Sequence, residues 1–504
     1  MMGKPVKKVV IAGGGTAGWC AAAALSRFLG PLLDITLVES EEIGIVGVGE
    51  STIPTIRTFH SFLGIDEREF LRATNATHKL AIAFENWGRD KDRYLHAFGE
   101  MGVSNWMAQF HHVWLEARSR GLVGDYGNYG FEYQAAEQGR FQGGEGSRLS
   151  YAYHLDAVLY GRFLRTLSEK IGVKRIEGRI QTVDQDSETG FVTALNLESG
   201  QRIEGDLFID CTGFRALLTE GALKTGYEDW SHWLPTDRAL AVQTESRGPL
   251  MPYTRAIAHG EGWRWRIPLQ NRVGNGLVYS SQYLSDEDAR QRFAGMLDAE
   301  PLFEPRLIRY QTGTRRLTWN KNVVALGLSS GFIEPLESTS IHLFQVGVTR
   351  LAQLFPFSGV NQPLIDRYNA LARHELERIR DFVILHYKAT ERDDTAFWRD
   401  RQAMPVPDTL QERMELFRET AEAYQDAGDL FRADSWVQVM MGQRIAPKTW
   451  HRLARMMSDT ELRQALSSIK DRIDHAVAAL PPQEQFIRTY LAAPPAHGRP
   501  QPAM

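Results

Sequence analysis

The sequence has very little cysteine, no long apolar run and no excess of charge of either sign. Its 504 residues include only two cysteines, Cys20 and Cys211, which cannot form a disulfide framework. No cluster of Cys and His has the spacing of a zinc site, so we expect no metal centre. Scarce cysteine fits a reducing compartment, and we expect a cytoplasmic protein. No apolar stretch reaches the ~18 residues that a membrane-spanning helix needs.

The charge balance excludes two classes of partner. Lys and Arg total 58 against 62 for Asp and Glu, which leaves a formal net charge of −4. Such a balance gives no electrostatic reason to expect nucleic acid or a membrane surface as a partner. Apolar residues make up 43% and charged residues 24%, as in ordinary globular proteins. We therefore expect a globular protein. Its expected state is a monomer or a homodimer, and its expected partner is a small molecule.

What the sequence does contain, near its start, is a strand–glycine–helix pattern. Residues 7–12 predict a short buried strand, residues 19–28 a helix and residues 34–38 a second strand. A strand, a helix and a strand in this order predict a parallel sheet covered by helices.

The turn between the first strand and the helix fits the motif G-x-G-x-x-G through Gly13, Gly15 and Gly18. In a dinucleotide-binding turn the first glycine makes the bend, the second lets the backbone approach a pyrophosphate, and the third lets the helix pack on the strand. The helix start at Thr16 and Ala17 would stabilise the phosphate charge. Glu39, about 20 residues further on at the end of the second strand, would bind a ribose hydroxyl. The alternative is an ordinary glycine-rich turn with a surface glutamate.

Later glycines indicate which dinucleotide binds. Residues 210–213 (DCTG) and the pair Leu326 and Gly327 are typical of flavoproteins that wrap an extended FAD over several strand ends. We expect Gly49 and Gly327 to contact FAD as well. No second G-x-G-x-x-G is present for a nicotinamide cofactor, so we expect the electrons to come from outside the chain.

The rest of the chain predicts an α/β fold, α+β overall, with a Rossmann-like FAD-binding module and an added substrate-side sheet. The sequence is loop-rich from about residue 40. Further strands are predicted at 174–182, 190–197, 201–209, 322–327 and within 237–280, and helices at 155–171, 336–390 and 409–490. These patterns divide the chain into an FAD-binding module (1–350) with an interleaved sheet (about 225–300), a helical part covering the substrate pocket (351–490) and a disordered tail (491–504).

Five segments of the chain carry a family resemblance. They are, in order, residues 47–54 (GVGESTIP), Lys79 and Leu80 before residues 84–87 (FENW), residues 208–214 (FIDCTGF), residues 263–268 (WRWRIP) and residues 332–339 (FIEPLEST). The fourth is a complete W-x-W-x-I-P motif. From about residue 5 to about residue 400 the sequence resembles the flavin-dependent halogenases, and within them the tryptophan halogenases.

The resemblance implies a particular chemistry. Reduced FAD, delivered by a separate flavin reductase, reacts with oxygen and a halide ion, chloride or bromide, to give hypohalous acid. The acid passes through the protein to Lys79, which holds it by a hydrogen bond or captures the halogen as a haloamine. A buried indole-like aromatic substrate is then halogenated.

Further roles follow from the motif that ends at Thr339. Glu337 matches the glutamate that orients the acid or accepts the ring proton, with Glu334 as a competing carboxylate. Ser338 links the lysine region to the flavin region. Thr339 and Ser340 match the halide site, where backbone N–H groups bind an anion. The family usually has glycine in place of Ser340, which leaves the preference for bromide or chloride open.

Aromatic residues complete the predicted site. Trp263 and Trp265 alternate on a strand and so face one side; the resemblance implies that they shield the flavin, and the alternative is two ordinary core indoles. His96 and Phe98 match the pair that sandwiches an indole, and Trp436 is a candidate third wall.

The sequence departs from the family in its C-terminal part. Halogenases of free tryptophan carry a tyrosine pair and a glutamate that clamp the amino-acid backbone, and residues 431–436 (FRADSW) show no such clamp. Indole, a substituted indole or a larger indole-containing molecule is therefore the expected substrate. Two other classes stay open at this point: a flavin monooxygenase that hydroxylates an aromatic substrate, and a non-catalytic flavin-binding protein.

Overall fold

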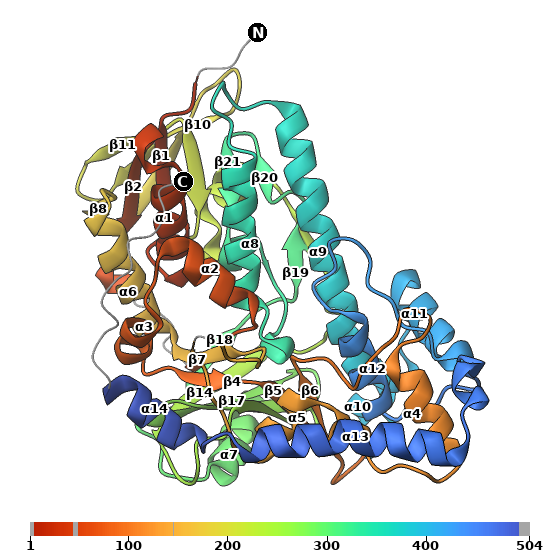
Figure 1. Ribbon diagram of the computed structural model, residues 1–504. Coiled ribbons are helices and arrows are strands. Elements are labelled where there is room, and N and C mark those ends of the chain that lie inside the picture. Colours follow the sequence, from red (N-terminus) through yellow and green to blue (C-terminus); the bar gives the residue numbers. More distant parts are fainter. Residues whose placement is uncertain (1–4, 44–48, 145, 493–504) are drawn as a thin grey trace.

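The first of two large sheets forms the upper part of the computed structural model, which describes residues 5–43, 49–144 and 146–492 (Figure 1). Neighbouring strands are parallel except for the pair at one edge, β20 and β21. The strand order is β20 (Trp319–Asn320), β21 (Val323–Ala325), β12 (Leu207–Asp210), β1 (Lys8–Ala12), β2 (Asp34–Glu39) and β8 (Lys174–Glu177). This confirms the Rossmann-like sheet that the sequence predicts.

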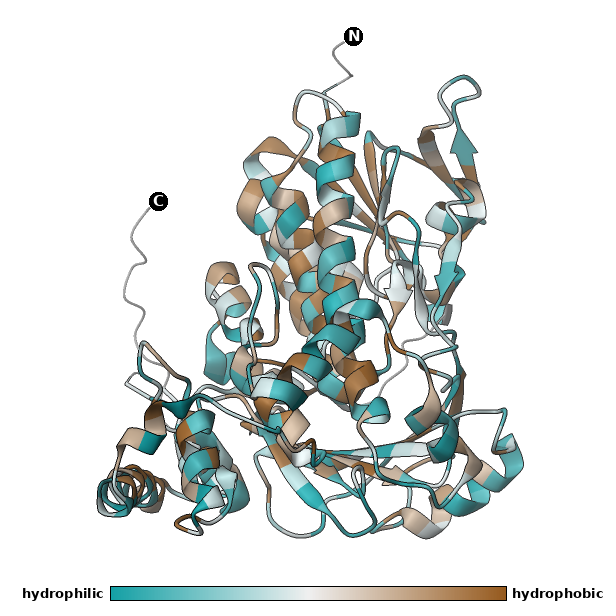
Figure 2. Ribbon diagram, turned by 90° about the vertical axis from the view of Figure 1, so that its right-hand side faces the viewer, coloured by the Kyte–Doolittle hydropathy of each residue, from teal (hydrophilic) through white to brown (hydrophobic). Residues whose placement is uncertain are grey.

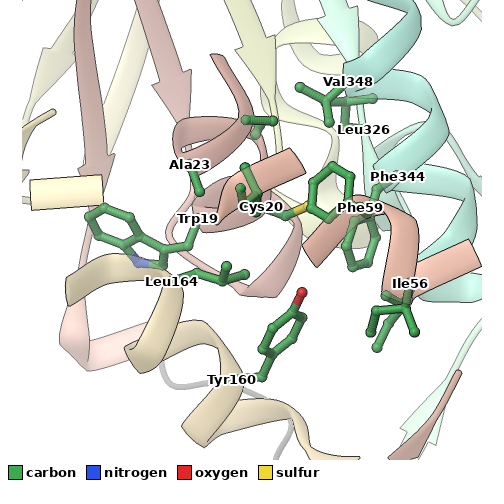
Figure 3. Close-up of a cluster of buried hydrophobic side chains, with 14 of the residues drawn as sticks. Trp19, Cys20, Ala23, Ile56, Phe59, Tyr160, Leu164, Leu326, Phe344 and Val348 are labelled. Carbon is green, nitrogen blue, oxygen red and sulfur yellow. The ribbon is translucent and has the colours of Figure 1, made fainter. Parts of the chain in front are cut away.

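Three helices pack together on this sheet: α1 (Thr16–Leu29), α6 (Ala157–Lys170) and α8 (Ser340–Gln353). Residues 21–24 of α1 are four consecutive buried alanines, whose small side chains let the neighbouring helices approach closely. Figure 3 shows the core that results: Trp19 of α1 lies on the side of Leu164 of α6, and Cys20 of α1 points to the other side, where Phe344 and Val348 of α8 lie. Burial of apolar surface of this kind contributes roughly 25 cal/mol per Å² to folding.

The second large sheet has seven strands and lies below the first in Figure 1. Its order is β18 (Arg306–Arg309), β14 (Arg238–Glu245), β17 (Arg272–Tyr279), β16 (Gly262–Pro268), β15 (Tyr253–His259), β5 (Ala81–Glu85) and β6 (Arg93–Ala97). The predicted range of 225–300 for this sheet is too narrow, because β5, β6 and β18 lie outside it. β5 is a short buried apolar run without alternation, and such a run is ambiguous in a sequence.

The segment after residue 40 is not loop-rich as predicted. It contains α2 (Thr55–Leu63), α3 (Glu67–Thr74), α4 (Phe110–Ser119) and α5 (Phe131–Glu137). These helices have two to three turns each, which gives too few repeats for a clear period of 3.6 residues. Their stability comes from packing against the rest of the chain.

Two predicted strands are each two strands in the structure. Residues 174–182 divide into β8 and β9 (Ile180–Gln185), and β9 joins β10 (Val192–Leu197) and β11 (Arg202–Glu204) in a separate antiparallel sheet. Residues 201–209 divide into β11 and β12. Gly178 and Gly205 lie at the two breaks, where a glycine allows the chain to leave one sheet and enter another.

Two small sheets connect the large ones. One has the order β3 (Gly49–Ser51), β7 (Ala152–Asp156) and β4 (Thr77–Lys79), and the other the order β13 (Tyr227–Asp229), β19 (Gly313–Arg315) and β22 (Gly331–Phe332). β4 is an edge strand of three residues, and all three are buried. It carries Lys79 into the interior between the two large sheets.

The C-terminal part is helical, as the periodicity predicts. It consists of α9 (Gln362–Lys388), α10 (Ala396–Ala403), α11 (Asp408–Thr420), α12 (Ala433–Gly442), α13 (Asp459–Ala478) and α14 (Gln483–Ala492). α9 runs beside α8, and α13 crosses the foot of the molecule toward α14, which contacts α3 (Figure 1). Teal and brown alternate around the long helices in Figure 2, so these helices are amphipathic.

The predicted disordered tail at 491–504 starts too early, because Leu491 and Ala492 belong to α14. Residues 493–504, like residues 47 and 48 of the first motif, lie outside the described residues. None of the helices that the structure describes has the length and apolar character needed to cross a membrane.

Candidate active site

The glycine turn after β1 has the geometry that a dinucleotide requires. Gly13 has φ +106°, and a Cβ there would lie 2.3 Å from the Cys211 carbonyl oxygen, while a Cβ on Gly18 would lie 1.9 Å from the Gly13 oxygen. Gly15 differs, since no described atom lies within 4 Å of a Cβ built on it. Helix α1 begins at Thr16, and no side chain of the described residues caps it. The first N–H groups of α1 and the open space over Gly15 therefore fit a phosphate.

Glu39 lies directly over this turn. A Cβ on Gly14 would be 1.6 Å from Glu39 Oε2, so only glycine fits below the carboxylate. Trp19 Nε1 donates a hydrogen bond of 3.2 Å to Oε2, and Arg175 Nε donates one of 2.5 Å to Oε1. Sequence reasoning missed Arg175, because β8 becomes the neighbour of β2 only when the sheet forms.

The other two predicted flavin contacts lie in different places. Gly327 has φ +69°, and a Cβ on it would be 2.8 Å from the Cβ of Ala17, so it lies at the glycine turn. Gly49 is in β3, where its Cβ position is 3.4 Å from the Cα of Gly274 in β17. Gly49 therefore lies where β3 crosses the second large sheet.

Lys79 is completely buried and has two fixed partners. Its Nζ donates hydrogen bonds to the Thr52 carbonyl oxygen (3.0 Å) and to Ser338 Oγ (2.9 Å). Nζ also lies 5.0 Å from the centre of the Phe98 ring. Burial lowers the pKa of Lys79 to about 7, although the negative charge of Glu337 opposes this shift. Both the ammonium and the amine are therefore populated near neutral pH.

Glu337 is a buried carboxylate between two histidines. His96 Nδ1 lies 2.9 Å from Oε2 and His386 Nε2 lies 2.7 Å from Oε1. Burial alone would raise the pKa of Glu337, but the charge of His96 and the hydrogen bonds from His386 and His96 lower it to about 2. Tyr94 OH lies 3.1 Å from Nδ1 of His386 and so extends the network. Sequence reasoning missed His386, which lies in the apolar run FVILHY of α9 and reads as a core residue.

Glu334 is also buried, but it belongs to a different network. Its Oε2 accepts hydrogen bonds from Trp263 Nε1 (2.8 Å), Tyr387 OH (2.8 Å) and Thr236 Oγ1 (3.2 Å). Its Oε1 is buried and has no hydrogen-bond partner in the described part of the chain. Burial raises the pKa of Glu334 to about 7, against the effect of these three hydrogen bonds. The pKa values of two carboxyl groups only three residues apart, Glu334 and Glu337, are thus shifted in opposite directions.

The predicted halide residues lie at the start of α8. Ser338 has φ +60°, which turns the chain so that α8 can begin at Ser340. Thr339 Oγ1 is buried and has no hydrogen-bond partner among the residues described. An unpaired buried hydroxyl beside a helix N-terminus is a fitting environment for an anion.

The aromatic side chains that line the predicted substrate end come from β6, α9, α12 and the segment just before α12. His96 lies 5.5 Å from the Phe382 ring and 6.1 Å from the Phe431 ring, centre to centre, and the two phenyl rings stack at 3.8 Å. Trp436 meets Phe382 edge to face at 4.9 Å. The sequence pointed to His96 and Trp436 but missed Phe382 and Phe431, which it gave no reason to separate from ordinary core residues.

Arg413 fixes the far side of Trp436. Its guanidinium carbon lies 4.7 Å from the Trp436 ring and 4.0 Å from the Tyr424 ring, and its Nη2 donates to Asp429 Oδ2 at 2.7 Å. Trp436 Nε1 is buried without a hydrogen-bond partner in the described residues. Trp436 is therefore held by contacts of its ring with Arg413 and Phe382 and not by its N–H group.

Trp263 and Trp265 are both buried on β16, with ring centres 6.1 Å apart. Trp263 is fixed by Glu334, whereas Trp265 packs on Gly276, where a Cβ would lie 1.9 Å from the indole. Among the described residues no group of three or more His, Cys, Asp or Glu side chains could hold a metal ion.

Comparison with known proteins identifies the family. The sequence matches the tryptophan halogenase family over residues 8–459. The chain belongs to the tryptophan halogenase family. It is 33% identical to the tryptophan 7-halogenase RebH of Lentzea aerocolonigenes, over 97% of this chain and 99% of the relative.

Solved structures agree with this assignment. The flavin-dependent halogenase Xcc4156 from Xanthomonas campestris is 54% identical, with a TM-score of 0.96 over 97% of this chain and 99% of its own. The flavin-dependent halogenase BrvH from Brevundimonas sp. BAL3 is 42% identical, with a TM-score of 0.92 over 96% of this chain and 99% of its own. This tryptophan halogenase family member is therefore a flavin-dependent halogenase that uses a flavin and a halide, and its family acts on tryptophan-like substrates.

Proposed function

We propose that this enzyme makes hypohalous acid from oxygen, a halide ion and reduced FAD, and that Lys79 guides the acid to an indole-like substrate. The observation that supports this proposal is the position of Lys79 between the hydroxyl of Ser338 and the ring of Phe98. Its Nζ is bonded to Ser338, next to the predicted halide residue Thr339, and it lies beside the ring of Phe98. The lysine thus stands between the halide end and the substrate end of the site.

The glycine turn is the proposed FAD site. Gly13, Gly15 and Gly18 would hold the pyrophosphate at the start of α1, and Glu39 would bind the ribose. Reduced FAD held there would give two electrons to oxygen, and the halide would give two more, so that the halide becomes hypohalous acid and the second oxygen atom becomes water. Because the sequence contains no second dinucleotide fingerprint, we propose that a separate flavin reductase delivers the reduced FAD.

Lys79 has a suitable number of N–H groups for its proposed role. Its ammonium has three donors, and Thr52 and Ser338 accept two of them. The third is left for the oxygen of hypohalous acid, and this hydrogen bond polarises the oxygen–halogen bond. The indole carbon attacks the halogen, that bond breaks, and the oxygen leaves as water after taking a proton from the ammonium.

Glu337 is the proposed acceptor of the ring proton. With its pKa lowered to about 2, the group is a carboxylate throughout the physiological range. The ring carbon that has gained halogen is a far stronger acid than a carboxylic acid, so a weak base suffices. His96 and His386 orient the carboxylate.

The proposed substrate is an indole-like aromatic, held mainly by burial and by contacts with His96, Phe98 and Trp436. The absence from residues 431–436 of the tyrosine pair and glutamate found in free-tryptophan halogenases supports this choice. Ser340, where the family usually has glycine, supports use of bromide as well as chloride.

The test is mass spectrometry of products. The purified enzyme would receive a flavin reductase, NADH, a panel of indoles, and equal bromide and chloride. We expect a halogen isotope pattern in the product, loss of that product in Lys79→Ala, and an unchanged yield in Lys170→Ala, whose lysine is exposed. A hydroxylated product free of halogen, or an unchanged yield in Lys79→Ala, would contradict the proposal.

A further inference from the structure

The strand that carries Lys79 depends on a contact from the opposite end of the chain. β4 pairs with β7 on one side only, where Lys79 lies opposite Ala152 and His78 opposite Tyr153. The other edge of β4 has no strand beside it in the described sheet. A three-residue edge strand is weakly held unless another group covers the edge.

Gln483, the first residue of α14, covers that edge. Its side-chain Oε1 accepts a hydrogen bond from the His78 backbone N–H at 2.8 Å, and its Nε2 donates to the Leu250 carbonyl oxygen at 2.9 Å. Its own backbone N–H donates to the Gly139 oxygen at 2.9 Å. Gln483 is fully buried, so these bonds form where water does not compete.

His78, beside Lys79 in β4, faces an aromatic cluster that α14 closes. The His78 ring stacks on Phe141 at 3.9 Å, and Phe486 of α14 meets both rings edge to face, at 5.5 Å and 5.2 Å. Neither ring nitrogen of His78 has a hydrogen-bond partner among the described residues. Burial lowers the pKa of His78 to about 3, so the ring is neutral and serves packing.

A further contact fixes the other end of α14. Tyr490 OH donates to Glu67 Oε2 at 3.0 Å, and Glu67 Oε1 accepts hydrogen bonds from Tyr151 and Tyr153, which flank the aromatic cluster. Helix α14 is thus attached at both ends to the elements around β4. It begins after residue 459, where the match to the family ends.

We propose that Gln483 is a positioning residue for Lys79: by holding the edge of β4, it keeps the Lys79 amine on Thr52 and Ser338. This inference rests on the proposed role of Lys79. His78 and Lys79 share one planar peptide unit, so a movement of β4 that shifts His78 also shifts Lys79, although their side chains point to opposite faces. If β4 moves, the formation of hypohalous acid is no longer fully coupled to halogenation: the acid still forms, but less of it reaches the substrate.

The test compares Gln483→Met with Gln485→Met in the full-length protein. Methionine keeps the length of glutamine and removes both amide hydrogen bonds, and Gln485 is an exposed residue of the same helix. Hydrogen exchange of the protein as isolated measures the His78 amide. Loss of one hydrogen bond should speed its exchange about 2- to 10-fold in Gln483→Met and leave it unchanged in Gln485→Met.

The second readout is the division of oxidant between product and a trap. A soluble thioether in excess, which hypohalous acid oxidises to the sulfoxide with release of halide, captures the acid that escapes. We expect the ratio of halogenated indole to sulfoxide to fall about 10-fold in Gln483→Met, because small displacements of a reacting group are costly. Simple loss of folded enzyme would lower both products together and leave the ratio unchanged.

The outcomes separate the two proposals. Suppose that Lys79→Ala abolishes halogenation, but Gln483→Met and Gln485→Met give the same ratio of halogenated indole to sulfoxide and the same exchange rate of the His78 amide. Gln483 then does not position the lysine. If Lys79→Ala halogenates normally, the proposed role of Lys79 is wrong instead. Should Gln483→Met fail to fold, Gln483→Leu also removes both amide hydrogen bonds, and an unchanged ratio in that variant would overturn the inference.

Discussion

Lys79 and Ser338 are joined by a hydrogen bond of 2.9 Å between Nζ and Oγ, although 259 residues separate them in the sequence. Ser338 makes this contact from a left-handed backbone conformation, with φ +60° and ψ +34°. The hydroxyl and the backbone of Ser338 can be tested separately, since glycine adopts this conformation without strain, whereas alanine, like serine, adopts it at a cost of roughly 1–2 kcal/mol.

Ser338→Ala and Ser338→Gly should both lower halogenation, about 10-fold, because each removes a hydrogen bond to a charged group. Their stabilities should differ. Alanine retains the backbone strain, so Ser338→Gly should be more stable than Ser338→Ala by about 1 kcal/mol. Thermal unfolding and product yield measure the two effects, and equal melting temperatures would argue against strain at this position.

Glu337→Gln should slow halogenation about 10²- to 10⁴-fold, as expected for loss of a general base. Product formation by Glu334→Gln, the matched change three residues earlier, should be much less affected. If Glu334→Gln is the more damaging change, the ring proton goes to the other carboxylate.

Glu337 should also contribute to stability at acid pH. Its pKa is lowered from 4.5 to about 2 in the folded protein, so its contribution is fully present above pH 4.5 and is lost as the pH falls toward 2. Wild type should therefore lose more stability than Glu337→Gln over this range. Urea unfolding at several pH values measures the difference.

Glu334 should show the opposite dependence on pH. Its pKa is raised from 4.5 to about 7, so between these values the folded protein binds a proton that the unfolded chain releases. The free energy of unfolding of wild type should fall, relative to Glu334→Gln, by about 1–3 kcal/mol as the pH rises from 4.5 to 7. Parallel curves for the two proteins would show that folding does not raise the pKa of Glu334.

Lys79 should make the share of hypohalous acid that halogenates the substrate depend on pH. With its pKa lowered to about 7, the ammonium loses its third N–H as the pH rises through that value. If the acid is held by a hydrogen bond, the ratio of halogenated indole to trapped oxidant should fall above pH 7. A ratio that rises above pH 7 would favour the haloamine route, in which the neutral amine captures the halogen.

The substrate prediction concerns the charged groups of tryptophan. A site without a clamp gains nothing from the ammonium and carboxylate, whose burial requires loss of water. Indole should therefore compete with equimolar tryptophan at least equally, as measured by the ratio of the two halogenated products. A strong preference for tryptophan would show that residues of the stretch 415–450 bind these charges.

The sequence predicted those parts of the fold that depend on local patterns. The glycine turn of Gly13 to Gly18 and the strand before it form a contiguous signal, and the helical period of α9 is long enough to be clear. Short elements such as β5 and α4 were missed because their stability depends on contacts with distant segments. Arg175 and His386 were missed for a related reason: nothing near them in the chain indicates that β8 lies beside β2, or that α9 lies beside Glu337.

Four positions between 334 and 339 reach four different parts of the enzyme. Glu334 holds the Trp263 indole, Glu337 joins the two histidines, and Ser338 holds the lysine. Thr339 stands at the N-cap of α8, and its buried hydroxyl has no partner in the part of the chain that the structure describes. One residue added or removed here would rotate every later side chain toward the wrong neighbour. This segment can therefore accept changes in side chains more readily than changes in length, and its spacing is a better guide than its composition to whether a related sequence retains the same chemistry.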